Sequence, residues 1–251
     1  MSTPVTYRDL LIDRYRLVHD WVPPGTRRLL DVGCGNAHFT KWLRDRADEV
    51  VGVDHNPRNC RAGHREYPGL HLAASAGEHL PFVSDYFDCV TCSDTLEHTD
   101  DDQATVDELL RVLKPGGTLV LTMPHGGLFG WMDAENLVNY PFVLVKALRI
   151  PKAGGGHRLD NFHFRPHRHY PLGKVLRLLG DRVEVEEVRR GGLFLYPFCY
   201  LIEKCFESFL GRDLCKIDYR FLRVVRAWDF KLPFGPLAFN VAVRVRKRGK
   251  A

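Results

Sequence analysis

One short segment constrains the fold of this chain more than any other. The apolar run Leu29–Val32 leads into Gly33 and Gly35, and a second apolar run ends at Asp54. Two glycines one residue apart let the backbone turn sharply and let a ligand approach it closely, because neither carries a Cβ atom. An acid about twenty residues later, at the end of the next strand, can accept hydrogen bonds from both hydroxyls of a ribose. The segment therefore predicts a nucleoside site at the carboxyl edge of a parallel sheet.

The residues around this turn argue against a dinucleotide ligand. A dinucleotide site needs a third glycine at position 38, where this chain has His38. The carboxylate of Asp31 would also repel a pyrophosphate, but it suits a ligand that carries an ammonium and a sulfonium.

The segment Asp31–Gly35 resembles the first motif of class I S-adenosylmethionine-dependent methyltransferases, and Asp54 is similar to their ribose-binding acid. The similarity to the small-molecule (type 11) methyltransferases extends from about residue 28 to residue 124. Four further segments match that family in their order and spacing, namely Glu78–Phe82, Tyr86–Val90, Leu96–His98 and Arg111–Val120. The resemblance implies an α/β fold, with a doubly wound, seven-stranded, mostly parallel Rossmann-like sheet and an antiparallel last strand at its edge. It also implies S-adenosyl-L-methionine as the cofactor.

The resemblance assigns roles to the residues of the first motif. Gly33 and Gly35 are expected to let the backbone approach the methionine part of the cofactor. Asp31 is expected to hold its ammonium, directly or through water, and Asp54 to bind its ribose.

Four further residues are assigned to the cofactor by the same resemblance. Glu78 is expected to border the adenine, while Ser93 and Asp94 close the site near the sulfonium. The family often has an acid next to the adenine where this chain has Ala76. The adenine is therefore expected to rest on backbone donors, including the Ala76 N–H, and on apolar walls.

Length and composition fit a single methyltransferase domain over residues 1–251, since 45% of the residues are hydrophobic. We expect an N-terminal helix and lead-in over 1–27, a cofactor-binding core over 28–123, and substrate-side helical or loop insertions over 124–169 and 191–236. Strands are predicted near 28–33, 49–54, 70–74, 87–92, 117–122, 182–189 and 237–245, and helices near 7–21, 37–46, 57–67, 102–113 and 171–180.

Several classes of protein are disfavoured by the sequence. It has neither a basic start followed by an apolar run nor a stretch of about twenty apolar residues, so we expect a cytoplasmic protein. Among seven cysteines, Cys89 and Cys92 face opposite sides of a predicted strand, which favours reduced, buried thiols. No second Cys-x-x-Cys pair exists, so no metal site is expected. Basic residues are not interleaved with stacking aromatics, so no nucleic-acid partner is expected.

The insertions carry the information on the substrate. The segments 141–150 and 196–210 have the periodicity of amphipathic helices. They either pack on the domain or on a second copy in a homodimer, or they form an apolar lid or interfacial patch that admits a lipid-like substrate. The net charge of +5 is concentrated in the basic end 244–250, which we interpret as a solvated tail, the alternative being contact with anionic lipid at a membrane surface.

Histidines concentrate in the first insertion and at its exit. An alcohol or phenol acceptor benefits from a base that titrates near neutrality, and imidazole meets that need. His125 follows the fifth predicted strand directly and is the first candidate for a general base, with His167 the second. The sequence thus predicts methyl transfer to a hydroxyl, less favourably to carbon or nitrogen, of a hydrophobic small molecule or lipid-linked acceptor. The alternative is a non-catalytic cofactor-binding scaffold or partner protein with the same fold.

Overall fold

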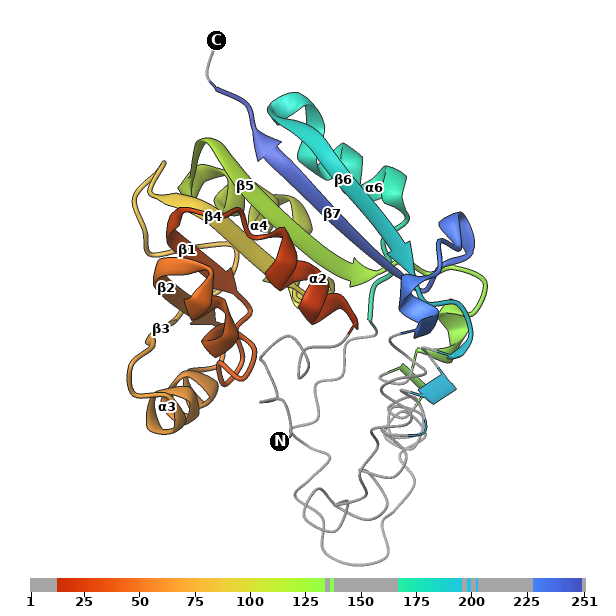
Figure 1. Ribbon diagram of the computed structural model, residues 1–251, viewed down its shortest axis with the longest axis horizontal. Helices are drawn as coiled ribbons and strands as arrows, with labels where there is room; N and C mark the ends of the chain where they lie inside the picture. Colours follow the sequence, from red (N-terminus) through yellow and green to blue (C-terminus); the bar gives the residue numbers. More distant parts are fainter. Residues whose placement is uncertain are drawn as a thin grey trace, which may run out of the picture.

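A single seven-stranded sheet organises the chain (Figure 1), in a computed structural model that describes residues 13–133, 136–137, 167–195, 198–199, 202 and 228–249. The strands are β1 (Thr26–Val32), β2 (Ala47–Asp54), β3 (His71–Ala74), β4 (Phe87–Ser93), β5 (Leu113–Pro124), β6 (Val183–Gly191) and β7 (Asn240–Lys247). Their order across the sheet is β3-β2-β1-β4-β5-β7-β6. The predicted α/β, mostly parallel, Rossmann-like fold is confirmed.

In the described part of the chain, four α-helices and several short 3₁₀ turns flank the sheet. The helices are α2 (Asp13–Trp21), α3 (Pro57–Glu66), α4 (Asp102–Val112) and α6 (Leu172–Leu179). The 3₁₀ turns are η1 (Thr40–Asp45), η2 (Leu96–His98), η3 (Gly130–Met132), η4 (Gly180–Arg182) and η5 (Gly235–Leu237). The side chains of Asn56 and Asp101 accept hydrogen bonds from the first backbone N–H groups of α3 and α4, which fixes where these helices begin.

The α-helix predicted near 37–46 is wrong. Ala37 has a φ of 62°, in the left-handed region that an α-helix cannot include. The chain therefore makes a turn from Cys34 to Ala37 first, and only the short η1 turn follows.

The last strand is antiparallel, as predicted, but it is not the edge strand. β7 pairs antiparallel with β5 on one side and with β6 on the other, so β6 forms the edge. Burial explains this arrangement, because Val241, Ala242, Val243 and Val245 are all buried, as both faces of an interior strand require. Val185 and Val188 on β6 are exposed instead.

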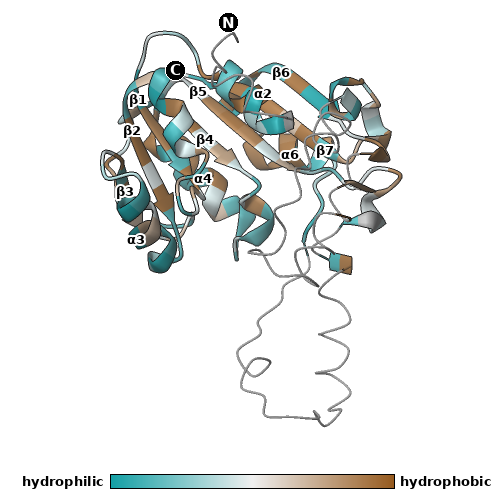
Figure 2. Cartoon of the chain, turned by 60° about the horizontal axis from the view of Figure 1, so that its bottom comes forward, coloured by the Kyte–Doolittle hydropathy of each residue, from teal (hydrophilic) through white to brown (hydrophobic). Residues whose placement is uncertain are grey.

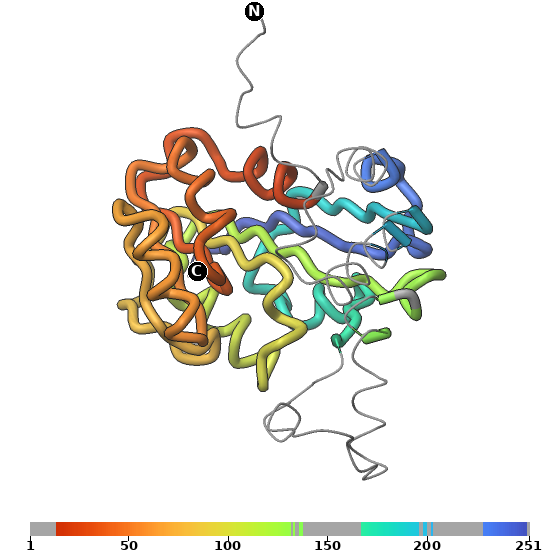
Figure 3. Tube along the Cα trace, turned by 90° about the horizontal axis from the view of Figure 1, so that it is seen from below, coloured from red at the N-terminus to blue at the C-terminus, as the bar shows by residue number. Residues whose placement is uncertain are grey.

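Helices cover both faces of the sheet, and the alternation of side chains assigns each strand residue to one face. In β5, Leu119 and Leu121 pack in the larger core, which includes side chains of α4 and α6. Val120 packs on the other face against Val18 of α2. Figure 3 shows α2 on one side of the strands and α4 on the other, and Figure 2 shows the strands as the most hydrophobic elements.

The structure tests the predictions made for the cysteines and for the C-terminal basic residues. Cys89 and Cys92 pack in different core clusters and are free thiols, as predicted. The basic residues Arg244, Arg246 and Lys247 belong to a paired strand and not to a solvated tail, which corrects the prediction. Arg244 and Arg246 lie in β7 and pair with Glu186 and Glu187 of β6, in the register allowed by a bulge between Val185 and Glu187.

Some predicted segments lie outside the described residues. They include 141–150, most of 196–210 and the beginning of the leading helix. In the described part of the chain, every helix is too short or too polar to cross a membrane.

Candidate functional site

The two glycines of the turn after β1 have different surroundings, since one lies against a side chain and the other faces open space. Gly33 and Gly35 have φ values of 79° and 54°, which favour glycine. The backbone N–H of Gly33 donates to the Val53 carbonyl at 2.7 Å and fixes the turn to the end of β2. A Cβ atom at Gly33 would lie 2.5 Å from Thr95 Cγ2, whereas nothing lies within 4 Å of a Cβ atom built at Gly35. Gly33 therefore makes room for Thr95, and Gly35 is the glycine that a ligand can approach.

Asp54 is held rigidly next to Gly35, at the end of β2. Its Oδ2 accepts from the Gly35 N–H at 3.0 Å, and its Oδ1 accepts from the Asn56 N–H at 2.9 Å and from Asn59 Nδ2 at 3.0 Å. A carboxylate oxygen has about two acceptor positions. Oδ2 therefore retains one for a ligand hydroxyl, beside the open space at Gly35.

Asp31, near the end of β1, is more deeply buried than Asp54. Its side chain is only 3% exposed, and its two oxygens accept hydrogen bonds from Thr40 Oγ1 at 2.6 Å and Thr91 Oγ1 at 2.8 Å. Burial raises the pKa of Asp31 to about 6, although the two hydroxyls oppose the shift. Its contact with a ligand ammonium remains a prediction.

The loop after β3 is tied to α4 by side chains of the resembling segments. Glu78 Oε1 accepts from the Asp100 N–H at 2.7 Å, and Glu108 Oε2 accepts from the Leu80 N–H at 2.7 Å. Arg111 binds Glu108 and donates to the Leu80 carbonyl at 3.0 Å. Glu78 thus has a structural role as well as its predicted place beside the adenine.

Ala76 lies in the same loop and is exposed. Its carbonyl accepts from the His79 N–H at 3.2 Å, and the preceding Ser75 N–H donates to the Asp54 carbonyl at 3.0 Å. The backbone around Ala76 is therefore linked to the end of β2, on the side where the ribose is predicted.

Ser93 and Asp94 follow β4 at the same edge of the sheet. Ser93 Oγ is buried and has no hydrogen-bond partner among the described residues. Asp94 forms an ion pair with Arg14 of α2, which brings the first described helix to the end of β4. Burial raises the pKa of Asp94, and the charge of Arg14 opposes the shift.

Asp133 joins two histidines of the first insertion. Its Oδ2 lies 3.2 Å from His167 Nδ1 and 3.2 Å from His169 Nε2. The His167 ring also contacts the His98 ring edge to face, with centroids 4.5 Å apart. Burial opposes ionisation of Asp133, but the two imidazoles more than offset it and lower the pKa of Asp133. Asp133 is not among the residues predicted from the sequence, because no local pattern links it to histidines 34 and 36 positions away.

His125 occupies a different environment. It is 6% exposed, its Nδ1 lies 3.1 Å from the Ala238 carbonyl, and its backbone N–H donates to the Phe239 carbonyl at 2.7 Å. Burial lowers the pKa of His125, which favours the neutral ring. A carbonyl partner requires the proton on Nδ1 and leaves the lone pair on Nε2.

Glu97 belongs to the resembling segment Leu96–His98, but the sequence assigns it no role in the site. It is 3% exposed in the η2 turn, and neither of its carboxyl oxygens has a hydrogen-bond partner among the described residues. Burial and the neighbouring charge of Asp94 raise its pKa well above the ordinary value for glutamate. Arg168 and Tyr170 donate to the Leu96 carbonyl at 2.8 and 3.1 Å, so this turn is held in place from the chain that follows the insertion.

The comparisons with known proteins agree with this geometry. Residues 30–121 match the methyltransferase domain family. An uncharacterized methyltransferase of Mycobacterium sp. (strain KMS) is 37% identical over 109 residues, which cover 41% of this chain and 43% of that protein. The chain therefore spans less than half the length of this curated relative.

Two solved structures share the fold over nearly the whole chain. A SAM-dependent methyltransferase from Methanosarcina mazei has a TM-score of 0.59 at 18% identity and covers 95% of this chain and 100% of its own. The [4+2]-cyclase SpnF has a TM-score of 0.58 at 20% identity, covering 93% of this chain and 81% of its own.

The chain thus combines a Rossmann-like, seven-stranded sheet with a glycine turn and an acid at the end of the next strand. The predicted resemblance to class I S-adenosylmethionine-dependent methyltransferases is confirmed over residues 30–121, which match the methyltransferase domain family.

Proposed function

We propose that this protein transfers a methyl group from S-adenosylmethionine to a hydroxyl group of a hydrophobic small molecule or lipid-linked acceptor. The observation that carries the proposal is the Asp54 carboxylate, held by backbone and side-chain donors beside the open space at Gly35. When bound, the cofactor supplies an electrophilic methyl group on a sulfonium.

The residues present fit this cofactor. Gly35 gives the ligand access to the backbone, and Asp54 Oδ2 retains an acceptor position for a ribose hydroxyl. The buried Ser93 Oγ, which lacks a partner among the described residues, is a polar atom that a bound molecule at the end of β4 can satisfy. These are contributions of three adjacent strands, β2, β1 and β4, at the edge where parallel sheets bind their ligands.

On the acceptor side, the arrangement favours His167 over His125 as a general base. Donation from His167 Nδ1 to Asp133 orients the imidazole and leaves its Nε2 lone pair to take a proton from an acceptor hydroxyl. His167 also lies close enough to Asp94 for their charges to interact, which connects it with the end of β4. His125 has a comparable tautomer but is more deeply buried behind the Ala238 carbonyl.

The alternative proposal is a cofactor-binding protein that does not transfer methyl groups. The similarity of the fold to a [4+2]-cyclase shows that this architecture does not fix the reaction, so the two proposals require different experiments.

The first experiment tests the cofactor. Calorimetry is expected to show binding of S-adenosylmethionine and S-adenosylhomocysteine but not of NAD. Asp54→Ala should weaken binding by about 10- to 100-fold, because the ribose loses a charged acceptor. Asp48→Ala, in an exposed position of the same strand, is the matched control and should bind normally. Unchanged affinity in Asp54→Ala would contradict the assignment.

The second experiment tests transfer. Cell extracts are incubated with the protein and a methyl-labelled cofactor, and products are identified by a mass shift of about one methyl group. Binding without any labelled product over the extracts tried would favour the scaffold.

A further inference from the structure

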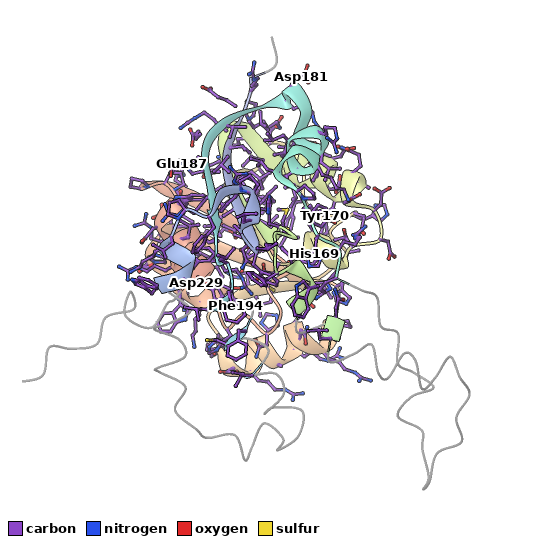
Figure 4. All side chains as sticks on the ribbon, turned by 90° about the vertical axis from the view of Figure 1, so that its right-hand side faces the viewer. His169, Tyr170, Asp181, Glu187, Phe194 and Asp229 are labelled. Atoms are coloured by element: carbon purple, nitrogen blue, oxygen red, sulfur yellow. The ribbon has the colours of Figure 1, made fainter. Side chains whose placement is uncertain are left out.

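A group of exposed hydrophobic side chains gathers at one end of the molecule. Leu128, Trp131, Trp228 and Leu237 are 58%, 66%, 60% and 49% exposed, and Phe194 and Phe198 are each 40% exposed. We call these six residues the aromatic rim. Figure 4 places Phe194 at the end of the molecule opposite Asp181. Exposed apolar side chains are ordinary when scattered, but a contiguous group marks an interaction surface.

Three segments of the chain meet at the rim. The Leu128 N–H donates to the Leu237 carbonyl at 3.1 Å, which joins the chain after β5 to the chain before β7. The rings of Phe129 and Phe194 lie 5.2 Å apart, and those of Phe194 and Phe198 lie 5.4 Å apart. The Gly192 N–H donates to the Asp229 carbonyl at 3.3 Å, beside Trp228.

The shape of the rim favours a lipid surface over a protein partner. Trp131 lies in the η3 turn and Leu237 in the η5 turn, so the apolar side chains are carried by short turns rather than by a flat helix or sheet face. A stable protein interface needs a complementary surface of about 800 Å² on each partner. A membrane interface needs only apolar side chains that can enter it, and tryptophan is well suited to that boundary.

The charges beside the rim point the same way. Arg189 and Lys231 have no ion-pair partner among the described residues. Arg189 donates to the Lys231 backbone carbonyl, which brings these two residues together next to Trp228 and Phe230. The nearby Asp229 is buried and accepts from the Leu193 N–H at 2.8 Å. The surface is thus apolar with a cationic margin, which is complementary to anionic lipid headgroups.

From this combination we propose that the aromatic rim docks the protein on an anionic lipid surface. This proposal places the membrane contact on the turns that connect to the sheet, not on the C-terminal basic strand. It does not require that the proposed methyl transfer be correct.

The location of the rim also connects it with the histidines. A Cβ atom at Gly126, two residues before Leu128, would lie 2.7 Å from His169 Cβ, and the rings of His169 and Phe239 are 6.4 Å apart. A lipid surface at the rim would therefore lie beside the side of the molecule where the acceptor is expected.

The test is co-sedimentation of the full chain with vesicles of phosphatidylcholine, with and without about one third phosphatidylglycerol. We expect binding to the anionic vesicles that weakens as salt rises from about 0.05 to 0.5 M, because screening acts on the cationic margin. The double variant Trp131→Ser, Trp228→Ser should bind at least about tenfold more weakly. Arg189→Glu with Lys231→Glu should lose the preference for the anionic vesicles.

Two controls keep the result specific. Val83→Ser removes a side chain that is 68% exposed elsewhere on the molecule and should leave binding unchanged. Thermal melts should show that the variants remain folded, since every substituted side chain is exposed or partly exposed. Wild-type protein that stays in the supernatant at low salt would overturn the proposal. A dimer in light scattering that the tryptophan substitutions dissociate, without vesicle binding, would show that a second copy covers the rim instead.

Discussion

Two groups of buried or partly buried carboxyl groups lie at the same edge of the sheet, and they are held in opposite ways. On the proposed cofactor side, Asp54 accepts hydrogen bonds from three N–H donors and Asp31 from two hydroxyls. On the proposed acceptor side, Asp94 pairs with Arg14, and Asp133 lies between His167 and His169. The carboxyl group of Glu97 has no hydrogen-bond partner among the described residues.

We interpret this difference as a division between ligand binding and chemistry. Donors supplied by the local backbone fix a carboxylate for a ligand that does not change, and they are encoded by a short motif. Titratable partners and an unsatisfied carboxyl are costly to bury, and they tend to occur where protons move or where an incoming molecule supplies the missing partner. The predictions below test whether this division is real.

The largest expected effect is on turnover. His167→Ala should lower the rate of methyl transfer by about 10²- to 10⁴-fold, because the acceptor proton loses its base. Binding of S-adenosylhomocysteine should stay normal, as calorimetry on the same sample can show. His125→Ala is the matched comparison and should lose less. Rates within about threefold of wild type in both variants would leave catalysis to proximity and orientation alone.

Substitutions at the two glycines of the turn should have different effects, one mainly on the stability of the fold and the other mainly on cofactor binding. Gly33→Ala should destabilise the fold by about 3 kcal/mol, because its Cβ atom would collide with Thr95 and φ is positive. Gly35→Ala meets no atom within 4 Å, so it should cost about 1 kcal/mol of strain and mainly weaken cofactor binding. Denaturant unfolding and calorimetry measure the two effects. Equal losses of stability would show that Gly35 is not an open approach for a ligand.

Glu97→Gln should stabilise the protein at neutral pH by about 1–3 kcal/mol, because a buried carboxyl without donors no longer has to ionise. The folded-state pKa of Glu97 lies above its ordinary value of 4.5, so the penalty is absent below about that pH, grows as pH rises from the ordinary pKa to the folded pKa, and stays constant above the folded pKa. The gain measured by thermal unfolding should therefore vanish near pH 4.

Glu108→Gln is the control, because it should change the free energy of unfolding in the opposite direction. Hydrogen bonds from Arg111 outweigh burial and lower the pKa of Glu108, so its ionised form stabilises the fold above the ordinary pKa, and the substitution should cost stability at neutral pH. A loss of stability in both variants would mean that Glu97 has a partner.

The smallest effect is expected at the β6–β7 ion pairs. Arg246→Ala should change the free energy of unfolding by less than about 1 kcal/mol, because the Arg246 side chain is 51% exposed and the pair is screened. Vesicle binding should not change, since the cationic margin of the rim lies elsewhere. A strong loss of vesicle binding would restore the C-terminal basic residues as the membrane contact.

The glycine turn and its carboxylates could be predicted from the sequence because they belong to consecutive elements. Asp31, Gly35 and Asp54 follow from one strand-turn-strand pattern, and the strand boundaries fall within a few residues of those expected. The cluster around Asp133 could not be predicted in the same way. Asp133 and His167 meet only because the chain returns across 34 positions, and no periodicity records that return.

Two misinterpretations have a common physical cause. The sequence predicts a solvated tail at 244–250 and an edge position for the last strand. Both predictions fail because a pattern within one strand does not show which strands lie on either side of it. Cross-strand partners such as Glu186 for Arg244 are set by the register of β6 on β7, which depends on the whole sheet.

The interior position of β7 has a consequence for how the chain assembles during synthesis. Among the strands that the structure describes, β6 pairs only with β7, although β7 is made later. Until the last strand emerges from the ribosome, β6 has no partner and β5 presents an open, hydrophobic edge. Unpaired strand edges of this kind are sites where nascent chains aggregate or bind chaperones. We therefore expect this half of the sheet to close last and all at once, when a single strand fills the gap between two others.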